Sequence, residues 1–169
     1  MAEEIEAKFF LNEPAMLRAK LLALGAELLE PRVYELNLRF DTPSMSLSAG
    51  KKVLRLRKDR RSRLTFKTPG MLKEGVLVRP EFEIEVSDFE ECRLILEGLG
   101  YQVFSAYEKY RETFSWDGLL IMLDEMPFGH FVEIEGQSPE AVRNLADKLG
   151  LAWEKRFLLS YMAIFDALK

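Results

Sequence analysis

The sequence is poor in the two residue types that most often build metal clusters and nucleophilic sites. Its 169 residues include one cysteine, Cys92, and one histidine, His130. A lone cysteine cannot form a disulfide within the chain, and one residue of each type cannot complete a zinc cluster. The sequence therefore excludes an internal disulfide and a cysteine–histidine zinc cluster, and it suits a reducing cytoplasm. We expect Cys92 to pack in the core and His130 to lie at the surface.

The chain also lacks the segments that would direct it to a membrane or to a glycine-loop nucleotide fold. Its ten glycines fall at predicted turns and helix ends, so we find no Walker or Rossmann glycine loop. No apolar run approaches transmembrane length, and the first residues carry no secretion signal. The formal net charge of −4 does not favour a nucleic-acid partner. We therefore expect a cytoplasmic protein that binds neither nucleic acid nor a membrane.

Hydrophobic periodicity and turn residues predict a single α+β domain over residues 1–169. A first strand around 4–9 is followed by strands at 33–40, 52–58, 62–68, 78–86, 103–114, 119–125 and 130–136. Helices are expected at 12–24, with Asn12 as N-cap and Gly25 at its end, and at 89–98, 138–150 and 157–168. Consecutive strands with short breaks favour an antiparallel sheet, and eight strands can close into a barrel with helices outside. The pattern alone leaves an open sheet equally possible.

Charged residues alternate with apolar residues along these strands. In the N-terminal segment E-x-E-x-K, Glu4, Glu6 and Lys8 share one face because side chains of a strand alternate sides. The same alternation recurs on strand after strand. The basic residues on these faces are Lys8, Arg55, Arg57, Lys67, Lys109 and Arg111. The acidic residues on them are Glu4, Glu6, Glu81, Glu83, Asp124, Glu133 and Glu135.

These charged faces predict a binding site rather than an ordinary solvated surface. The opposite, apolar faces need cover, which amphipathic helices can supply from outside, and the charged faces would then line the interior. Unpaired buried charge is costly, so such an interior must hold water and a ligand. Several cations suit a polyanion with several phosphoryl groups, and clustered carboxylates suit a hard cation such as Mg²⁺ or Mn²⁺. The pattern therefore predicts a metal–polyphosphate site.

The motifs, taken in order, resemble a known family. The series is E-x-E-x-K, FDTP, LRLR, T-x-K, an E-x-E strand, K-x-R, LD-x-x-x-x-G and VEIEG. It is similar to that of the CYTH superfamily, the triphosphate tunnel metalloenzymes, which include class IV adenylyl cyclases, thiamine triphosphatases and inorganic triphosphatases. The resemblance spans nearly the whole chain. It implies a tunnel of eight antiparallel strands with helices outside, Mg²⁺ or Mn²⁺ as cofactor, and a homodimer.

The resemblance also implies roles for the charged residues. The expected triphosphate ligands are Lys8, Arg55, Arg57, Lys67, Lys109 and Arg111. The expected metal ligands are Glu4, Glu6, Asp124, Glu133 and Glu135, together with the middle acidic strand of Glu81 and Glu83. Lys67, Glu4 and Glu6 are the expected catalytic residues.

One position departs from the family pattern. Where thiamine triphosphatase-like members often have a tyrosine two residues before the aspartate of FDTP, this chain has Arg39. That tyrosine is implicated in proton transfer, which an arginine cannot perform near neutral pH, but Arg39 can add a further cation to the triphosphate site.

The first hypothesis is therefore metal-dependent hydrolysis of a triphosphate, inorganic or organic. Cyclisation of ATP to cyclic AMP and pyrophosphate by a class IV adenylyl cyclase is the alternative. A non-catalytic polyphosphate-binding or nucleotide-binding module is a third, from a different class of protein.

Overall fold

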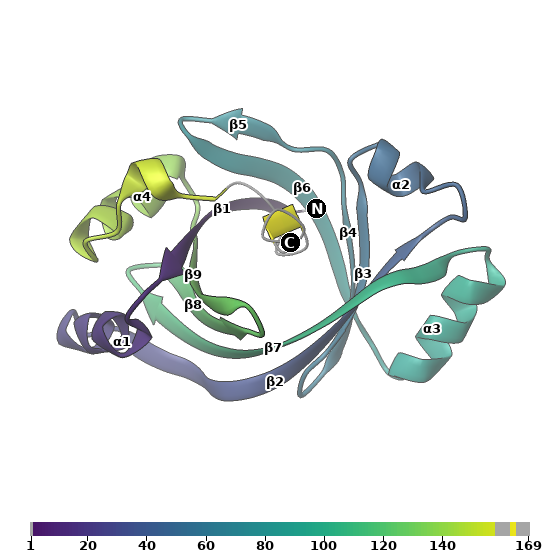
Figure 1. The fold of residues 1–169 in the computed structure, drawn as a ribbon, viewed down its shortest axis with the longest axis horizontal. Helices are drawn as coiled ribbons and strands as arrows, with labels where there is room; N and C mark the ends of the chain where they lie inside the picture. The colour runs from purple at the N-terminus through teal and green to yellow at the C-terminus, as the bar shows by residue number, and fades with distance from the viewer. Residues whose placement is uncertain (1, 158–162, 165–169) are drawn as a thin grey trace. The chain divides into compact units, whose positions relative to one another are not determined.

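The computed structural model describes residues 2–157 and 163–164, which form one β-sheet and four α-helices (Figure 1). The strands are β1 (Ala2–Leu11), β2 (Glu27–Asp41), β3 (Val53–Lys58), β4 (Ser62–Lys67), β5 (Met71–Lys73), β6 (Val76–Val86), β7 (Gln102–Trp116), β8 (Leu119–Met126) and β9 (Gly129–Glu135). The helices are α1 (Pro14–Ala23), α2 (Ser46–Ala49), α3 (Phe89–Gly98) and α4 (Pro139–Lys148), and a 3₁₀ turn, η1, covers Trp153–Lys155.

The strand pairing closes on itself. The strands pair in the order β1-β9-β8-β7-β2-β3-β4-β6-β5, and β1 also pairs with β6. Eight strands therefore form a closed series of hydrogen-bonded neighbours, and the three-residue β5 extends from β6. This pairing confirms the predicted class, α+β with an eight-stranded antiparallel barrel, and it excludes the open sheet that the sequence pattern also allowed.

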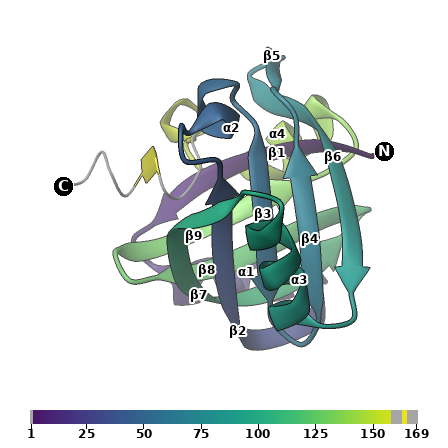
Figure 2. The ribbon, with the colours of Figure 1, turned by 90° about the vertical axis from the view of Figure 1, so that its right-hand side faces the viewer.

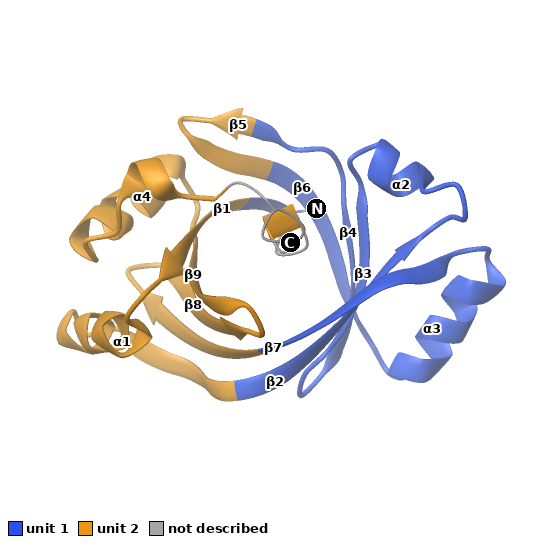
Figure 3. Ribbon diagram, viewed as in Figure 1, with its two compact units in different colours: residues 1–4, 33–71, 79–109 blue, residues 5–32, 72–78, 110–169 orange. Residues whose placement is uncertain are grey.

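The chain divides into two compact units (Figure 3). Unit 1 comprises Met1–Glu4, Val33–Met71 and Arg79–Lys109, and unit 2 comprises Ile5–Arg32, Leu72–Val78 and Tyr110–Lys169. Each unit has its own apolar core, described below. The single domain over 1–169 stays a prediction.

Unit 1 is built around the apolar face of β2, β3 and β4. Figure 2 shows α3 lying across these strands. Asp88 caps the start of α3 by accepting a hydrogen bond from Glu91 N, and the helix buries Cys92 and Leu96, one turn apart. Both side chains pack with Leu56 and its apolar neighbours on the strands. The core position predicted for Cys92 is confirmed.

Unit 2 has a larger core between its strands and the helices α1 and α4. Leu17 and Leu21 of α1 and Leu145 of α4 are buried against apolar side chains of β1, β7, β8 and β9. On β1 and β9 the buried apolar residues alternate with charged ones, so on these two strands the helices cover the faces opposite the charges. The predicted location of the helices, outside the barrel, is confirmed by this packing.

Several details differ from the sequence-based expectations. The N-cap of α1 is Glu13, not Asn12, and it makes no side-chain cap bond. The elements α2 and β5 were not among the predicted helices and strands, and β2 begins six residues before the predicted position 33. The predicted helix at 157–168 lies outside the described residues apart from Phe157, which forms an isolated bridge with Lys8, and the helical positions 163 and 164.

No helix in the described part of the chain combines the length and apolar character that a membrane crossing requires.

Candidate functional site

A cluster of cations lies in unit 1, on neighbouring strands of the sheet. Arg39 of β2 lies directly opposite Arg55 of β3 in the strand register, and Arg57 lies opposite Asn37. Lys109 comes from β7, the strand that pairs with β2 on its other side. Lys109 and Arg57 are only 2% and 8% exposed. Four positive charges are therefore gathered on three adjacent strands, where burial strengthens their effect on any anion.

One member of this cluster has a carboxylate partner from β2. Arg57 forms a close ion pair with Glu35, and its Nε donates a hydrogen bond of 2.9 Å to Asn37 Oδ1. Glu35 and Asn37 are 1% and 0% exposed. These two residues fix the guanidinium of Arg57 in place, because a buried charge requires a partner and a defined set of hydrogen bonds.

Tyr107 lies among the same cations. It precedes Lys109 by two residues on β7, so both side chains have the same strand parity, and its side chain hydrogen-bonds to Arg55. Burial opposes ionisation of the phenol, but the charges of Arg55, Lys109 and Arg57 outweigh it and lower the pKa of Tyr107 to about 8. The pKa of the Arg39 guanidinium is lowered as well, because burial outweighs the charge of Tyr107, which raises it.

Lys67 of β4 lies between two carboxylates of unit 1. Its Nζ is 2.6 Å from Glu4 Oε2 and 3.6 Å from Glu81 Oε2. Burial, together with a hydrogen bond to Glu4 and that residue's charge, raises the pKa of Glu81 to about 8. Two carboxylates that share a site favour retention of one proton between them, and Lys67 only partly offsets this effect.

Glu83, the other acidic residue of the middle strand, has different partners. Thr65 Oγ1 donates a hydrogen bond of 2.8 Å to Glu83 Oε2, and Arg63 Nη1 lies 3.8 Å from Glu83 Oε1. Glu83 is exposed, whereas Thr65 is buried. Glu83 therefore contacts two side chains of β4, and its predicted role as a metal ligand stays a prediction.

The acidic residues of unit 2 surround Arg111 on β7. The guanidinium makes two hydrogen bonds with Asp124, Nε to Oδ1 at 2.6 Å and Nη2 to Oδ2 at 2.8 Å, and a third to Glu133 Oε2 at 2.9 Å. Asp124 lies directly opposite Arg111 in the β7–β8 register. Such a fork-shaped pairing holds both side chains in one geometry.

Glu6 and Glu133 are the carboxylates of unit 2 best placed to share a cation. Oxygens of these two side chains lie within 4.8 Å of one another. In the β1–β9 register Glu6 lies opposite Glu135, and Lys8 lies opposite Glu133. Carboxylate oxygens at this spacing are the donor set that Mg²⁺ and Mn²⁺ prefer, so these residues fit the predicted ion.

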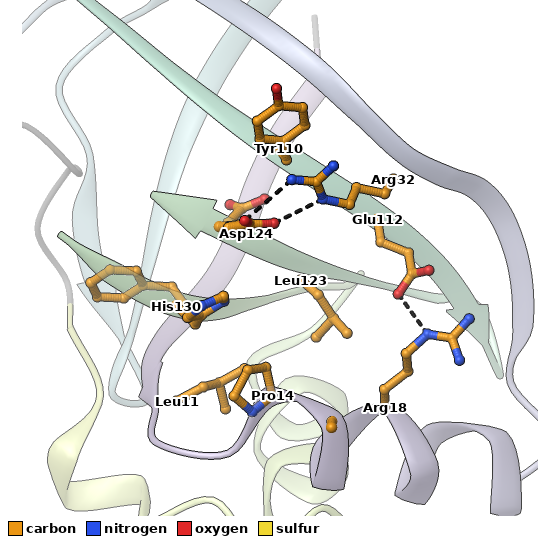
Figure 4. A pocket seen from close by; sticks show the side chains of 12 residues that line it. Leu11, Pro14, Arg18, Arg32, Tyr110, Glu112, Leu123, Asp124 and His130 are labelled. Carbon is orange, nitrogen blue, oxygen red and sulfur yellow. Dashed lines mark hydrogen bonds and ion pairs between the residues drawn. The ribbon is translucent and has the colours of Figure 1, made fainter. Parts of the chain in front are cut away.

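A cavity of about 280 Å³ occurs in unit 2, beside α1, and Asp124 is among its lining residues (Figure 4). Both of its arginines are paired with carboxylates of the lining. Arg18 Nε lies 2.9 Å from Glu112 Oε1, and Arg32 Nε lies 2.8 Å from Glu125 Oε2. His130, which was predicted to lie at the surface, also lines this cavity and is partly exposed. Because the lining has three carboxylates and two guanidinium groups, we do not assign this cavity to a polyphosphate.

The family of the chain follows from comparison with known proteins. A sequence model of the CYTH domain matches residues 2–158. The chain belongs to the CYTH domain family. Members of this family are metal-dependent enzymes, adenylyl cyclases and triphosphatases. The predicted resemblance is confirmed, and no curated protein matches the chain by sequence.

Solved structures share the CYTH fold of this chain. A candidate adenylate cyclase from Vibrio parahaemolyticus is similar at 22% identity with a TM-score of 0.87, covering 96% of this chain and 97% of that one. A Pyrococcus horikoshii OT3 protein is similar at 25% identity with a TM-score of 0.82, covering 98% and 99%. HpAC1 from Hippeastrum, a candidate adenylyl cyclase described as having dominant triphosphatase activity, is similar at 23% identity with a TM-score of 0.71, covering 98% and 96%.

The predicted CYTH site residues fall into two groups in the structure. Unit 1 contains Glu4, Arg39, Arg55, Arg57, Lys67, Glu81, Glu83 and Lys109, and unit 2 contains Glu6, Lys8, Arg111, Asp124, Glu133 and Glu135. Sequence reasoning missed Glu35, Asn37 and Tyr107. Their signal was present, because Glu35 and Asn37 alternate with Arg39 on one strand and Tyr107 alternates with Lys109 on another. On those two strand faces only the basic residues, Arg39 and Lys109, were predicted as ligands.

Proposed function

We propose that this CYTH protein hydrolyses a triphosphate with the help of Mg²⁺ or Mn²⁺. The observation that carries the proposal is the grouping of Arg39, Arg55, Arg57 and Lys109 on β2, β3 and β7, two of them nearly fully buried. Glu35 forms an ion pair with Arg57 of this cluster. Guanidinium and ammonium groups gathered in this way suit a polyanion whose oxygens accept several N–H bonds at once.

The cations would supply most of the catalysis. As the terminal P–O bond breaks, negative charge builds on the pyrophosphate leaving group, and fixed guanidinium and ammonium groups stabilise that charge without having to reorganise. Arg55 and Arg57 present planar forks, whereas Lys109 acts as a compact charge. We assign triphosphate binding also to Lys8, Lys67 and Arg111, as expected from the sequence.

The carboxylates would hold the cation and orient the attacking water. Glu6 and Glu133 are the central metal ligands of the proposal, supported by the spacing of their oxygens, with Glu4, Asp124, Glu135 and Glu81 as further candidates. The ion, when bound, supplies charge neutralisation on phosphate oxygens. Metal binding to Glu81 requires loss of the proton that its raised pKa favours.

Cyclisation of ATP is the second candidate, because the same phosphate contacts would serve it. The ribose 3′-hydroxyl would replace water as the nucleophile, and pyrophosphate would again leave. Structures described as those of candidate adenylate cyclases are similar in fold, and the Hippeastrum protein is described as mainly a triphosphatase. We place hydrolysis first because it requires no pocket for the adenine ring.

The test is product analysis with inorganic tripolyphosphate, ATP and thiamine triphosphate, each with Mg²⁺, Mn²⁺ or EDTA. Phosphate release from tripolyphosphate that EDTA abolishes is the expected result. Glu4→Gln/Glu6→Gln should lose this activity. Glu3→Gln is the matched control, since Glu3 is exposed and lies next to Glu4 on the other face of β1. Cyclic AMP and pyrophosphate from ATP would favour the cyclase, and tight binding without turnover would favour a binding module.

A further inference from the structure

Tyr107 lies among the cations of the cluster but has no assigned role in the proposed hydrolysis. It is partly buried on β7, and its side chain hydrogen-bonds to Arg55 of β3, the strand on the far side of β2. Arg39 and Glu35 of β2, Arg57 of β3 and Lys109 of its own strand are the other charged groups that act on it.

The arrangement stabilises Tyr107 as an anion in the free protein. The charges of Arg55, Lys109 and Arg57 outweigh burial and the charge of Glu35, which both oppose ionisation. The resulting pKa of about 8 leaves a sizeable fraction of phenolate near neutral pH, whereas an ordinary tyrosine remains protonated. The phenolate thus acts as an internal anion for cations that we assign to the triphosphate.

A phenolate and a phosphate oxygen cannot both use these cations at low cost. Two anions held within the same cluster repel each other, and the repulsion raises the pKa of the group that can accept a proton. A protonated phenol, by contrast, is a hydrogen-bond donor, and each phosphoryl oxygen is an acceptor. The favourable state of the complex is therefore a neutral Tyr107 that donates to the ligand.

We infer that Tyr107 is a further triphosphate-binding residue whose hydroxyl takes up a proton when the triphosphate binds and then donates a hydrogen bond to a phosphoryl oxygen. The proton comes from solvent and adds to the phenolate oxygen, and no covalent bond of the ligand forms or breaks in this step. The inference rests on the proposed function, because it assumes that Arg55, Arg57 and Lys109 bind the triphosphate.

The inference predicts a specific pH dependence of affinity. Above the pKa of free Tyr107, the protein must bind one proton together with the ligand, so the dissociation constant rises with pH. Between one pH unit below that pKa and one unit above it, the protonated fraction falls about tenfold, and affinity falls with it. Tyr107→Phe has no hydroxyl to protonate, so its dissociation constant should not show this rise with pH.

The experiment measures binding of inorganic tripolyphosphate in EDTA, which prevents turnover, by calorimetry in two buffers of different ionisation enthalpy. Wild type, Tyr107→Phe and the control Tyr110→Phe are compared at one pH unit below and one pH unit above the pKa of free Tyr107. Tyr110 is a suitable control because it is exposed and has the opposite strand parity. Protonation of tripolyphosphate itself is common to all three proteins and cancels in the comparison.

The expected result is extra proton uptake in wild type and Tyr110→Phe, and an affinity that falls about tenfold more with pH than in Tyr107→Phe. The ultraviolet absorbance of phenolate should also fall when tripolyphosphate is added to wild type, a readout that does not depend on the variant folding. Equal proton uptake and pH dependence in all three proteins, with no loss of absorbance, would overturn the inference and leave the proposed function standing. Failure of wild type to bind tripolyphosphate at all would overturn both.

Discussion

Lys67 Nζ lies 2.6 Å from Glu4 Oε2, so a predicted phosphate ligand and a predicted metal ligand form an ion pair with each other. Lys67 is 12% exposed and Glu4 is 7% exposed, which means that solvent screens the pair only weakly. On our proposal, Lys67 exchanges this contact for a phosphate oxygen when the substrate binds. Glu4 exchanges it for the metal ion. Glu81, 3.6 Å from Lys67, completes the group.

Replacing Lys67 with methionine should therefore reduce triphosphate hydrolysis far more than it reduces stability. Loss of one fixed charge that stabilises the transition state typically costs about 10²–10³ in rate. The measurement is kcat and KM for tripolyphosphate with Mg²⁺, and Lys52→Met, at an exposed position, is the control. A Lys67→Met protein with kcat close to that of wild type would show that Lys67 is not a catalytic residue.

The Arg57–Glu35 pair should contribute strongly to stability. Arg57→Met leaves the carboxylate of Glu35 buried without its guanidinium, a change that costs about 3–5 kcal/mol for buried pairs. Removing both charges in Arg57→Met/Glu35→Leu should recover a large part of that loss. Urea unfolding of the three proteins measures the difference. If the double variant were no more stable than the single one, Glu35 would not be the partner that matters.

Asp41 of the FDTP motif should be a structural residue rather than a ligand of substrate or metal. Its carboxylate is fully buried and accepts hydrogen bonds from Thr42 N, Leu47 N, Ser48 N and Ser48 Oγ, which hold the short helix α2. Asp41→Ala leaves these donors, in partly buried hydrogen bonds, without their acceptor, and we expect a loss of about 2–3 kcal/mol in the free energy of unfolding. Asp88→Ala, which removes the exposed cap of α3, should cost only about 1 kcal/mol.

The stabilisation that Asp41 contributes should decrease as pH falls. Burial opposes ionisation of Asp41, but the hydrogen bonds from Ser48, Leu47 and Thr42 outweigh it and hold its pKa below the ordinary value. The stabilisation is therefore fully present above the pKa of an unfolded aspartate and is lost as pH falls through the lower pKa of the folded protein. The stability difference between wild type and Asp41→Ala should shrink in acid. A constant difference would contradict this account.

Tyr107 should give a stability change of the same sign as Asp41, but in an alkaline pH window. Its folded pKa of about 8 lies below that of an unfolded tyrosine, about 10, so the folded state binds fewer protons between these values. The free energy of unfolding of wild type should rise relative to Tyr107→Phe as pH increases through this window, by on the order of 1–2 kcal/mol. Below pH 8 this contribution is lost. Denaturant unfolding of both proteins across the window measures the effect, and parallel curves would refute the lowered pKa.

Two properties of the fold could be predicted from local patterns. Alternation of charged and apolar residues has a period of two in any strand, so the faces that carry Glu6 and Lys8, or Arg55 and Arg57, were visible without coordinates. The helices at Asp88 and Ser138 were likewise predicted from cap residues and apolar spacing, and both caps make the expected hydrogen bonds.

The partners of each charged group could not be predicted in this way. That Arg111 binds Asp124 and Glu133 depends on the register between consecutive strands, and that Tyr107 lies beside Arg55 depends on the pairing of β7, β2 and β3, which are far apart in the chain. A slip of one residue between strands would exchange these contacts without changing any local pattern.

The sequence by itself therefore determined which residues face the charged side of the sheet and which kind of ligand that side suits. The tertiary structure alone decided that the strand pairing closes, which charges pair with one another, and which of them act on a phenol such as Tyr107. The reason is physical: side-chain direction along a strand is a local property of the backbone, whereas pairing, burial and pKa depend on contacts between residues distant in the sequence.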